Sequence, residues 1–483
     1  MCSIVGLQGN VKAENIIKML KTSKNRGPDS SGIYLDKIYE DINLEEFTDD
    51  NVYPIAFGHN LLSIYDLDTR ISKPQPVSSE NLVLVFNGEL YNFPTMRNFL
   101  SKVGVEAQIN SDADALLYLI DFYAKKLDLV KAVQSAIRLI DGDYAFAVWD
   151  GENLAIARDP LGVKPLFYGQ NDEFKAFASS RQSLKEVGIT DINTLKPEHI
   201  LYNWQDISPA QPIYEKVFEG DVAKIDKALK LSVSKRIEGL SEVGVIFSGG
   251  LDSSYLALLL KEISQNIALK IKLYAVGVEG SHDVEAAIYA SKFLNLDLEI
   301  CEVTEELVRE ALPDVVKAIG DDNLMKIGVG LTTYFATQMA ARDGLKVAIS
   351  GQGADELFGG YKRYVQSFID ETLNYDLRED MSNMYHVNLE RDDACSMLNS
   401  VELRLPFLDK NLVELVLNIP DNKKIVSMHD DMRKSILRKI AFEEGLDYEI
   451  AYRPKKAAQY GTGIDKILRK KIIKDTDISK YLE

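Results

Sequence analysis

A short loop rich in glycine and serine follows an apolar strand in the middle of the chain. The run 243–247 is followed by Ser248–Ser254, in the order Ser-Gly-Gly-Leu-Asp-Ser-Ser, and then by the apolar helical segment 255–260. A strand, a glycine turn and a helix start direct backbone N–H groups at an anion. No lysine follows to reach a γ-phosphate, so this is not a Walker A loop. The loop predicts binding of pyrophosphate as a leaving group, with Asp252 placed to hold Mg²⁺.

A second glycine loop strengthens this interpretation over a simple helix cap in a tight turn, which is the alternative for the first loop alone. Ser350–Glu356 reads Ser-Gly-Gln-Gly-Ala-Asp-Glu and follows the apolar strand 347–349. Ligands of parallel sheets bind at the carboxyl ends of strands, near a switch point. We therefore expect both loops to line one site.

Cys2 stands directly after Met1 and enters the apolar run Ser3–Gly6. If Met1 is removed, Cys2 carries its own α-amine, whose pKa of about 7.7 to 8.0 in model peptides lets it act as a base. Nucleophile and base would then share one residue. The alternative is a chance small residue after methionine.

An amide and a glycine follow the apolar strand 82–86 and could serve such a nucleophile. Asn87 and Gly88 offer a side-chain amide and a backbone N–H, both suitable donors to an oxyanion. The segments 26–29 and 158–162 also contain polar residues, and their Pro and Gly positions indicate ordinary turns.

Composition limits the function classes. A length of 483 residues predicts two or three domains, and 46% hydrophobic with 27% charged residues is typical of folded proteins. The formal charge of −18 disfavours binding to nucleic acids and anionic membranes. Three widely spaced cysteines suggest neither a disulfide framework nor a zinc site. With no spanning helix or signal-peptide pattern, a cytoplasmic location is expected.

Short strands mixed with amphipathic helices predict an α+β layered domain over residues 1–205. The expected strands are 3–7, 53–57, 82–86, 143–149, 154–158 and 174–179, and the expected helices are 14–21, 113–124 and 129–140.

A different order begins after a proline-containing linker at 206–222, which we expect to be a surface crossover starting near Gln205. Residues 223–483 alternate strand and helix, which predicts an α/β domain with a parallel sheet. The part from Ser382 onward is expected to be mostly helical. The expected elements are 243–247, 254–263, 273–278, 284–295, 298–303 and 347–349.

Nine ordered motifs make the chain resemble the glutamine-hydrolysing asparagine synthetase family. They span nearly the whole sequence and lie at 1–6, 26–33, 87–92, 111–112, 158–162, 248–254, 350–356, 401–409 and 453–456. The resemblance implies a class II glutamine amidotransferase domain of the N-terminal nucleophile type, followed by an ATP pyrophosphatase-type domain.

The resemblance also implies roles in the first domain. Cys2 would attack glutamine, Asn87 and Gly88 would hold the oxyanion, and the residues that bind glutamine would be Ser63, Glu89 and Asp112.

In the second domain, ATP would adenylate the side-chain carboxylate of aspartate, and ammonia passed internally from the first domain would displace AMP. Mg²⁺ would lie on Asp252 and Asp355, and Lys455 would stabilise charge in the transition state. The residues beside ATP would be Phe247, Ser248, Gly249, Gly250, Asp252, Ser253, Val276, Ser350 and Gly351. A homodimer is compatible with the sequence, which does not set the oligomeric state.

An acyl adenylate hydrolyses when water enters, and ammonia must arrive unprotonated. An apolar route disfavours ammonium by desolvation, so we predict a passage between the two domains.

Three positions depart from the family pattern. Leu61 stands where relatives carry an arginine that grips the α-carboxylate of glutamine, and Arg26 or Arg70 are the candidate replacements. Gln352 replaces a usual glutamate, and the segment 322–330 lacks the Thr-Thr-x-Arg run of aspartate binding, although it offers Lys326. The alternatives are therefore an amide-forming relative that uses another carboxylate, an enzyme that prefers free ammonia, and a non-catalytic relative.

Overall fold

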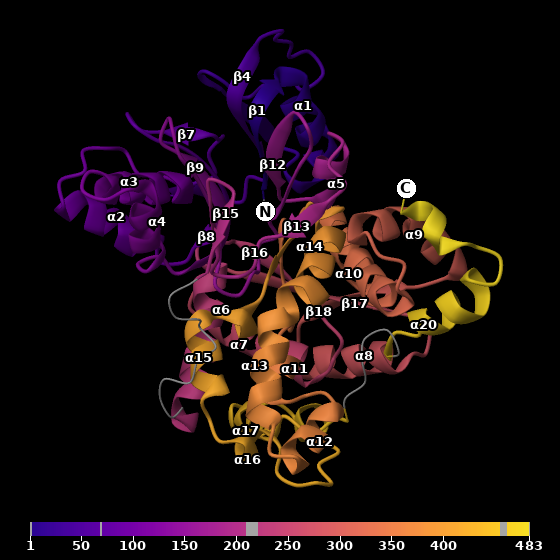
Figure 1. Cartoon of the computed structure of the whole chain (residues 1–483). Helices are drawn as coiled ribbons and strands as arrows, with labels where there is room; N and C mark the ends of the chain where they lie inside the picture. The colour runs from indigo at the N-terminus through magenta and orange to yellow at the C-terminus, as the bar shows by residue number, and fades with distance from the viewer. Residues whose placement is uncertain (1, 68–69, 209–220, 455–460, 483) are drawn as a thin grey trace. The chain divides into compact units, whose positions relative to one another are not determined.

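The computed structural model describes residues 2–67, 70–208, 221–454 and 461–482. The chain forms two compact units, residues 1–212 and 213–483 (Figure 1). Most of the expected linker 206–222 falls outside the described residues. Its start differs from the expected surface crossover, because Gln205–Ile207 forms strand β15 and pairs with the preceding strand, β14. In the described part of the chain, every helix is too short or too polar to cross a membrane.

Two antiparallel sheets form the first unit. The seven-stranded sheet has the order β13 (Ile192–Thr194), β11 (Phe167–Gln170), β12 (Phe174–Ala178), β1 (Ser3–Lys12), β4 (Val52–Leu61), β2 (Ser30–Tyr34) and β3 (Ile38–Tyr39). The six-stranded sheet has the order β15, β14 (Ile200–Tyr202), β10 (Leu154–Arg158), β9 (Gly142–Trp149), β8 (Val83–Leu90) and β7 (Val77–Ser78). A separate hairpin joins β5 (Asp66–Leu67) to β6 (Arg70–Ile71).

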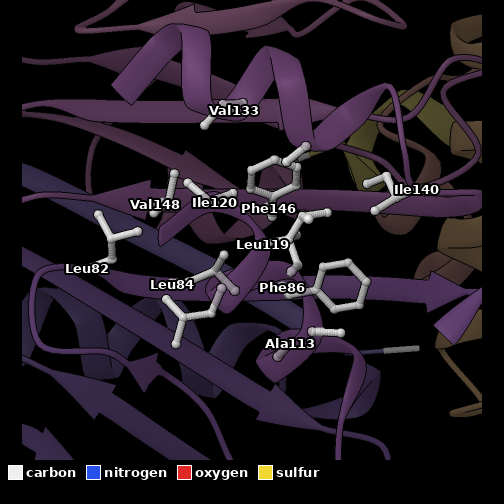
Figure 2. Close-up of a cluster of buried hydrophobic side chains, with 14 of the residues drawn as sticks. Leu82, Leu84, Phe86, Ala113, Leu119, Ile120, Val133, Ile140, Phe146 and Val148 are labelled. Atoms are coloured by element: carbon white, nitrogen blue, oxygen red, sulfur yellow. The ribbon is translucent and has the colours of Figure 1, made fainter. Parts of the chain in front are cut away.

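Successive side chains of β8 point to opposite faces of the sheet and show what packs against each face. Leu84 and Phe86 pack into a buried cluster with helices α2 (Phe93–Lys102), α3 (Asp112–Ala124) and α4 (Leu129–Ile137), shown in Figure 2. Val85 points to the opposite face, where it joins Phe57 of the other sheet in the core between the sheets. Helices α1 (Ala13–Thr22) and α5 (Arg181–Lys185) cover the outer face of the seven-stranded sheet. The predicted layered α+β architecture is confirmed, in the order helix, sheet, sheet, helix.

The second unit contains a sheet in which every strand pair is parallel. Its order is β18 (Asp297–Glu302), β17 (Lys270–Gly277), β16 (Glu242–Ile246), β19 (Val347–Ile349) and β20 (Glu402–Arg404). The chain runs from β16 outward to β18 and then returns to β19 on the other side of β16, so β16 and β19 flank a switch point. The predicted parallel α/β sheet is confirmed.

Helices connect and surround these strands. They are α6 (Ile225–Ile237), α7 (Leu251–Ser264), α8 (His282–Leu294), α9 (Glu305–Ile319), α10 (Leu324–Arg342), α11 (Ala354–Phe358), α12 (Arg363–Ile369), α13 (Leu373–Met384), α14 (Glu390–Met397), α15 (Lys410–Leu417), α16 (Asp421–Lys424), α17 (Ser435–Glu443), α18 (Tyr448–Ala451) and α20 (Ile464–Ile467). The part after Ser382 is mostly helical as expected, with β20 as an edge strand of the sheet inside it.

Candidate functional site

The first unit places Cys2 beside Asn87. The backbone nitrogen of Cys2 donates a hydrogen bond of 3.0 Å to Asn87 Oδ1. Asn87 is fully buried, and its Nδ2 has no hydrogen-bond partner among the described residues. A buried amide without an acceptor is costly. The site therefore keeps a donor ready for an oxygen atom that arrives with a ligand.

Strand β8 does not end at Phe86, as the apolar pattern predicted, but continues through Asn87, Gly88 and Glu89 to Leu90. Gly88 lies opposite Tyr144 of β9, and a Cβ atom at Gly88 would overlap the backbone of Asp143 and Tyr144. Only glycine fits this close approach. Because β8 is regular here, Asn87 and Glu89 project on the same side of the strand.

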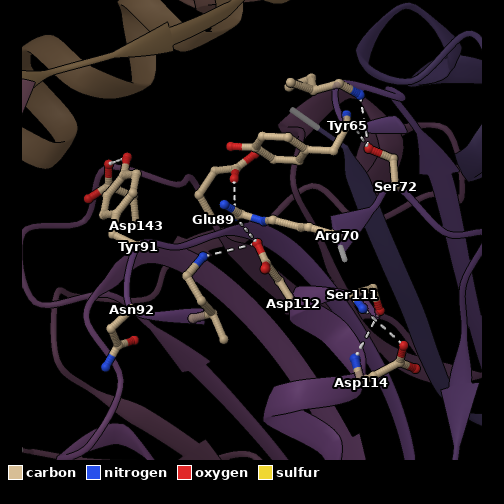
Figure 3. Close-up of polar contacts among 12 residues, drawn as sticks. Tyr65, Arg70, Ser72, Glu89, Tyr91, Asn92, Ser111, Asp112, Asp114 and Asp143 are labelled. Atoms are coloured by element: carbon tan, nitrogen blue, oxygen red, sulfur yellow. Dashed lines mark hydrogen bonds and ion pairs between the residues drawn. The ribbon is translucent and has the colours of Figure 1, made fainter. Parts of the chain in front are cut away.

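A buried ion cluster surrounds Glu89 (Figure 3). Arg70 Nη2 donates to Glu89 Oε2 at 2.7 Å and to Asp112 Oδ2 at 2.6 Å. Asp112 is the first residue of α3, and its Oδ2 also accepts a 3.1 Å bond from the N–H of Leu90. The guanidinium of Arg70 lies 4.0 Å from the ring centroid of Tyr65. The structure thus joins the two carboxylates predicted to bind glutamine, with a cation from β6 between them.

Charge and burial oppose one another in this cluster. Burial raises the pKa of Asp112 to about 6, and the neighbouring Arg70 acts against that rise. Burial favours loss of the Arg70 proton, but the carboxylates of Asp112 and Glu89 hold the pKa of Arg70 above its usual value. One cation therefore offsets part of the cost of burying two carboxylates.

Other motif residues of the first unit shape turns. The N–H of Ser63 donates to Asp29 Oδ2 at 2.6 Å, which ties the segment after β4 to the turn at 26–29. The guanidinium of buried Arg158 donates to the backbone carbonyls of Lys164, Leu195 and Gly162. The side chain of Asp159 accepts three backbone amides, from Leu161, Val163 and Lys164. The turn interpretation of segment 158–162 is consistent with these bonds.

In the second unit, the two glycine loops meet at the switch point. Ser248 follows β16 and Ser350 follows β19, and the position of a Cβ at Gly351 lies 3.1 Å from Asp252 Cβ. Both loops line one cavity of about 610 Å³. The predicted nucleotide and metal residues that line it are Phe247, Ser248, Gly250, Asp252, Ser253, Val276, Ser350, Gly351 and Asp355.

Gly249 lies outside that lining set and has a different role. Its φ angle is +64°, and a Cβ atom there would overlap the backbone of Ala286 and Ala287 in α8. The glycine permits both the turn and the close packing of α8. Helix α7 then begins at Leu251, so that Asp252 and Ser253 lie in its first turn.

Lys434 is a cavity residue that sequence reasoning missed. Its Nζ lies 2.6 Å from both Asp252 Oδ2 and Asp355 Oδ1, and its side chain is only 2% exposed. The residue precedes α17 in a left-handed conformation, with φ of +51°. No pattern links residue 434 to either glycine loop. Only the fold could have revealed it.

A polar network lies further along the same cavity. Tyr361 and Asn388 donate to Glu356 Oε1 at 2.6 and 2.7 Å, and all three residues line the cavity. Asn388 belongs to a π-helical turn, Tyr385–Leu389, and such turns are frequent at functional sites. Gln352 also lines the cavity.

Comparisons with known proteins identify the family. A model described as a glutamine amidotransferase domain matches residues 1–230, and one described as asparagine synthase matches 224–374 and 369–477. A protein of Methanocaldococcus jannaschii named as a glutamine-hydrolysing asparagine synthetase is 37% identical, covering 97% of this chain and 95% of its own. The chain belongs to the glutamine-hydrolysing asparagine synthetase family.

Two further proteins are similar at lower sequence identity. Asparagine synthetase B of Escherichia coli is 26% identical, over 96% of this chain and 83% of its own. A solved structure of the glutamine phosphoribosylpyrophosphate amidotransferase of B. subtilis is 20% identical, with a TM-score of 0.38, over 64% of this chain and 70% of that one.

The structure shows where the residues lie that differ from the asparagine synthetase family pattern. Leu61 ends β4 as a buried apolar residue, and the cation near Glu89 and Asp112 comes from Arg70 instead. Lys326 pairs with Asp321 at 2.7 Å. The predicted Lys455 lies outside the described residues.

Proposed function

We propose that the protein is a glutamine-dependent asparagine synthetase that consumes ATP and aspartate. The observation that carries the proposal is the pairing of Cys2 with Asn87, whose Nδ2 is a buried donor without a partner in the described chain, in a chain that matches this family along its length. The arrangement is what a thiol nucleophile with an oxyanion donor requires.

Glutamine hydrolysis would begin after removal of Met1. The α-amine of Cys2 takes the thiol proton, and the sulfur attacks the carboxamide carbon of glutamine. Asn87 Nδ2 and the Gly88 N–H hold the oxyanion. Ammonia leaves with the transferred proton, and water then cleaves the thioester to release glutamate and restore the thiol. Asn87 Oδ1 fixes the nitrogen of Cys2 at 3.0 Å during these steps.

Amide formation would take place in the cavity at the switch point. A side-chain oxygen of aspartate attacks the α-phosphorus of ATP, and pyrophosphate leaves. Ammonia then attacks the acyl carbon, AMP leaves, and one proton is released. The turn at Ser248–Ser254 and the start of α7 direct N–H groups toward the leaving pyrophosphate. Lys455 would stabilise charge in the transition state.

The donor set of the cavity fits a hard divalent cation. Oxygens of Asp252 and Asp355 converge on a single cation, Lys434 Nζ, and Asp252 Oδ1 is buried without a hydrogen-bond partner among the described residues. Mg²⁺ is commonly held by one or two carboxylates together with substrate phosphates. Asp252 and Asp355 would hold Mg²⁺, which neutralises phosphate charge when bound.

One observation favours a second candidate, an amide-forming enzyme for another carboxylate. Lys326, the cation that segment 322–330 offers, is already paired with Asp321. The cations that do line the cavity include Arg391 and Arg453. An acceptor other than aspartate would use the same adenylation chemistry.

The deciding experiment is an acceptor screen scored by AMP release from the full-length protein with ATP and Mg²⁺. Glutamine and ammonium are compared as nitrogen donors. AMP formation that depends on aspartate supports asparagine synthesis, and dependence on another acid supports the second candidate. No AMP with any acceptor or donor would contradict both and favour a non-catalytic relative.

A further inference from the structure

The cation of the first-unit ion cluster comes from a position that the family pattern does not supply. Leu61 brings no charge, and Arg70, from the hairpin strand β6, reaches both Glu89 and Asp112. Arg70, Glu89 and Asp112 are 7%, 4% and 9% exposed. Because water screens these charges poorly, the placement of each one strongly affects any charged ligand that enters.

The bonding of the cluster is incomplete on both sides. Arg70 Nε is buried and has no hydrogen-bond partner in the described chain, and the same is true of Asp112 Oδ1. Arginine carries five N–H donors in a planar fork, which suits a carboxylate bound through two of them. The cluster therefore presents one unmet donor and one unmet acceptor, on two side chains that are already joined by a 2.6 Å hydrogen bond.

These two unmet groups match the two charges of a free α-amino acid. The α-ammonium is a donor for Asp112 Oδ1 and Glu89, and the α-carboxylate is an acceptor for the remaining N–H groups of Arg70. The Tyr65 ring, 4.0 Å from the guanidinium carbon, holds the plane of the fork in place. An amine without an α-carboxylate would pair with the carboxylates of Asp112 and Glu89 but would leave the N–H groups of Arg70 without an acceptor.

We infer that Arg70 binds the α-carboxylate of glutamine and that, before glutamine binds, it pairs with the two carboxylates that receive the α-ammonium. The inference rests on the glutaminase function proposed above. Glutamine binds by exchange: its ammonium takes over part of the bonding of Glu89 and Asp112, and Arg70 turns the released N–H groups toward the α-carboxylate. Arg70 is thus a specificity-determining residue, remote from the reacting carboxamide.

The test compares two substrates on full-length protein. 4-Aminobutanamide is glutamine without its α-carboxylate, and ammonia release from each is measured for wild type, Arg70→Gln and Arg70→Lys. Arg97→Gln is the matched control, because Arg97 lies over the ring of Phe93 at 5.9 Å from its centroid, and Arg70 lies over the same ring at 5.6 Å. Circular dichroism and thermal unfolding report whether each variant is folded, and ammonium-dependent AMP release reports on the second unit alone.

We expect Arg70→Gln to raise the KM for glutamine by roughly 100-fold while kcat changes much less. Its kcat/KM for 4-aminobutanamide should stay near the wild-type value, so that the preference for glutamine collapses. Arg70→Lys should be intermediate, since lysine keeps the charge without the fork. A purely structural role would lower kcat/KM for both substrates equally, and that result, or an unchanged preference, would overturn the inference.

Two further outcomes are distinguishable. If Arg70→Gln does not fold, the substrate preference of Arg70→Lys decides by the same criterion. If wild-type protein neither releases glutamate from glutamine nor is labelled at Cys2 by a diazoketone analogue of glutamine, the glutaminase function itself is wrong. If wild-type protein is labelled at Cys2 and hydrolyses glutamine, but the variants keep the same preference for glutamine over 4-aminobutanamide, only the role of Arg70 is rejected.

Discussion

The ammonium group of Lys434 lies 2.6 Å from the carboxylate of Asp252, although 182 residues separate them along the chain. It lies equally close to Asp355, which follows a different strand of the sheet. A single buried cation therefore joins the two glycine loops to the start of α17. The electrostatics of the cavity depend on this contact, because two carboxylates facing a polyphosphate repel it unless cations compensate.

We predict that Lys434→Met lowers AMP formation by about 100-fold, which is the range found when a preorganised charge is removed from a reacting centre. Glutamate release from glutamine should be unchanged, because Lys434 belongs to the second unit. Both rates are measured on the same preparation.

Lys439→Met is the matched control for that change. Lys439 lies on α17, the helix that Lys434 precedes, with its side chain 64% exposed and only a 3.7 Å pairing to Glu443. It should behave as wild type. Equal rates in Lys434→Met and Lys439→Met would show that the contact with Asp252 has no part in adenylation.

A second prediction concerns the oxyanion donor. Asn87→Ala should lower kcat for glutamine hydrolysis by about 10² to 10³, because it removes the buried Nδ2 beside Cys2. Cys2→Ala should abolish hydrolysis. Both variants should retain ammonium-dependent AMP release, which shows that the second unit is intact. Asn81→Ala, on an exposed loop before β8, should have no effect, and full hydrolysis by Asn87→Ala would remove Asn87 from the mechanism.

A third prediction uses the pH dependence of stability. Lys424 is fully buried, and burial lowers its pKa to about 7, below the unfolded value of 10.5. Between these values the unfolded chain binds more protons, so stability rises with pH; below about pH 7 the buried group is charged and destabilises the fold. Lys424→Met should therefore raise the free energy of unfolding by roughly 5 kcal/mol at pH 6, since the pKa falls from 10.5 to about 7 on folding and each pKa unit is worth about 1.4 kcal/mol.

The gap between Lys424→Met and wild type should narrow as the pH rises from 7 to 9.5. Thermal unfolding followed by circular dichroism across this range measures it. Lys423→Met changes the exposed neighbouring residue and should show no such trend. A constant gap at all pH values would mean that packing, and not the charge of Lys424, causes the difference.

A fourth prediction concerns nitrogen transfer. If ammonia passes internally, asparagine made from amide-labelled ¹⁵N-glutamine should keep most of the label in the presence of excess unlabelled ammonium. Release into solvent would instead dilute the label, because most ammonia is protonated at neutral pH and exchanges with the pool. Mass spectrometry of the asparagine distinguishes the two routes, and label at the bulk ratio would contradict the predicted passage.

Local patterns predicted many of the strands and the two glycine loops, because burial on a sheet has a short period. The strand at 82–86 is a typical case, and only its end was wrong. Asn87 and Glu89 interrupt the apolar alternation, yet β8 continues through them because its partner β9 still pairs there. Strand β20 was missed because three residues within a helical region carry almost no periodic signal.

The contacts that complete each site could not be predicted in this way. Arg70 could be named as a candidate cation, but its pairing with Glu89 and Asp112 depends on how β6, β8 and α3 pack together. Lys434 had no signal at all, since a lysine before a helix usually lies in solvent. Long-range charge pairing follows from the tertiary fold and from the need to neutralise buried carboxylates.

The regular geometry of β8 also fixes the spacing between two residues of the site. Asn87 and Glu89 are two residues apart, and their side chains project on the same side of an extended strand. This spacing places their backbones about 6.7 Å from each other. Under the proposed function, Asn87 contacts the carboxamide of glutamine and Glu89 contacts its α-ammonium. Asparagine carries the same two groups with one methylene fewer, so under that function it would span this spacing less well than glutamine does. The strand would thereby protect the newly made amide from the thiol that supplied its nitrogen.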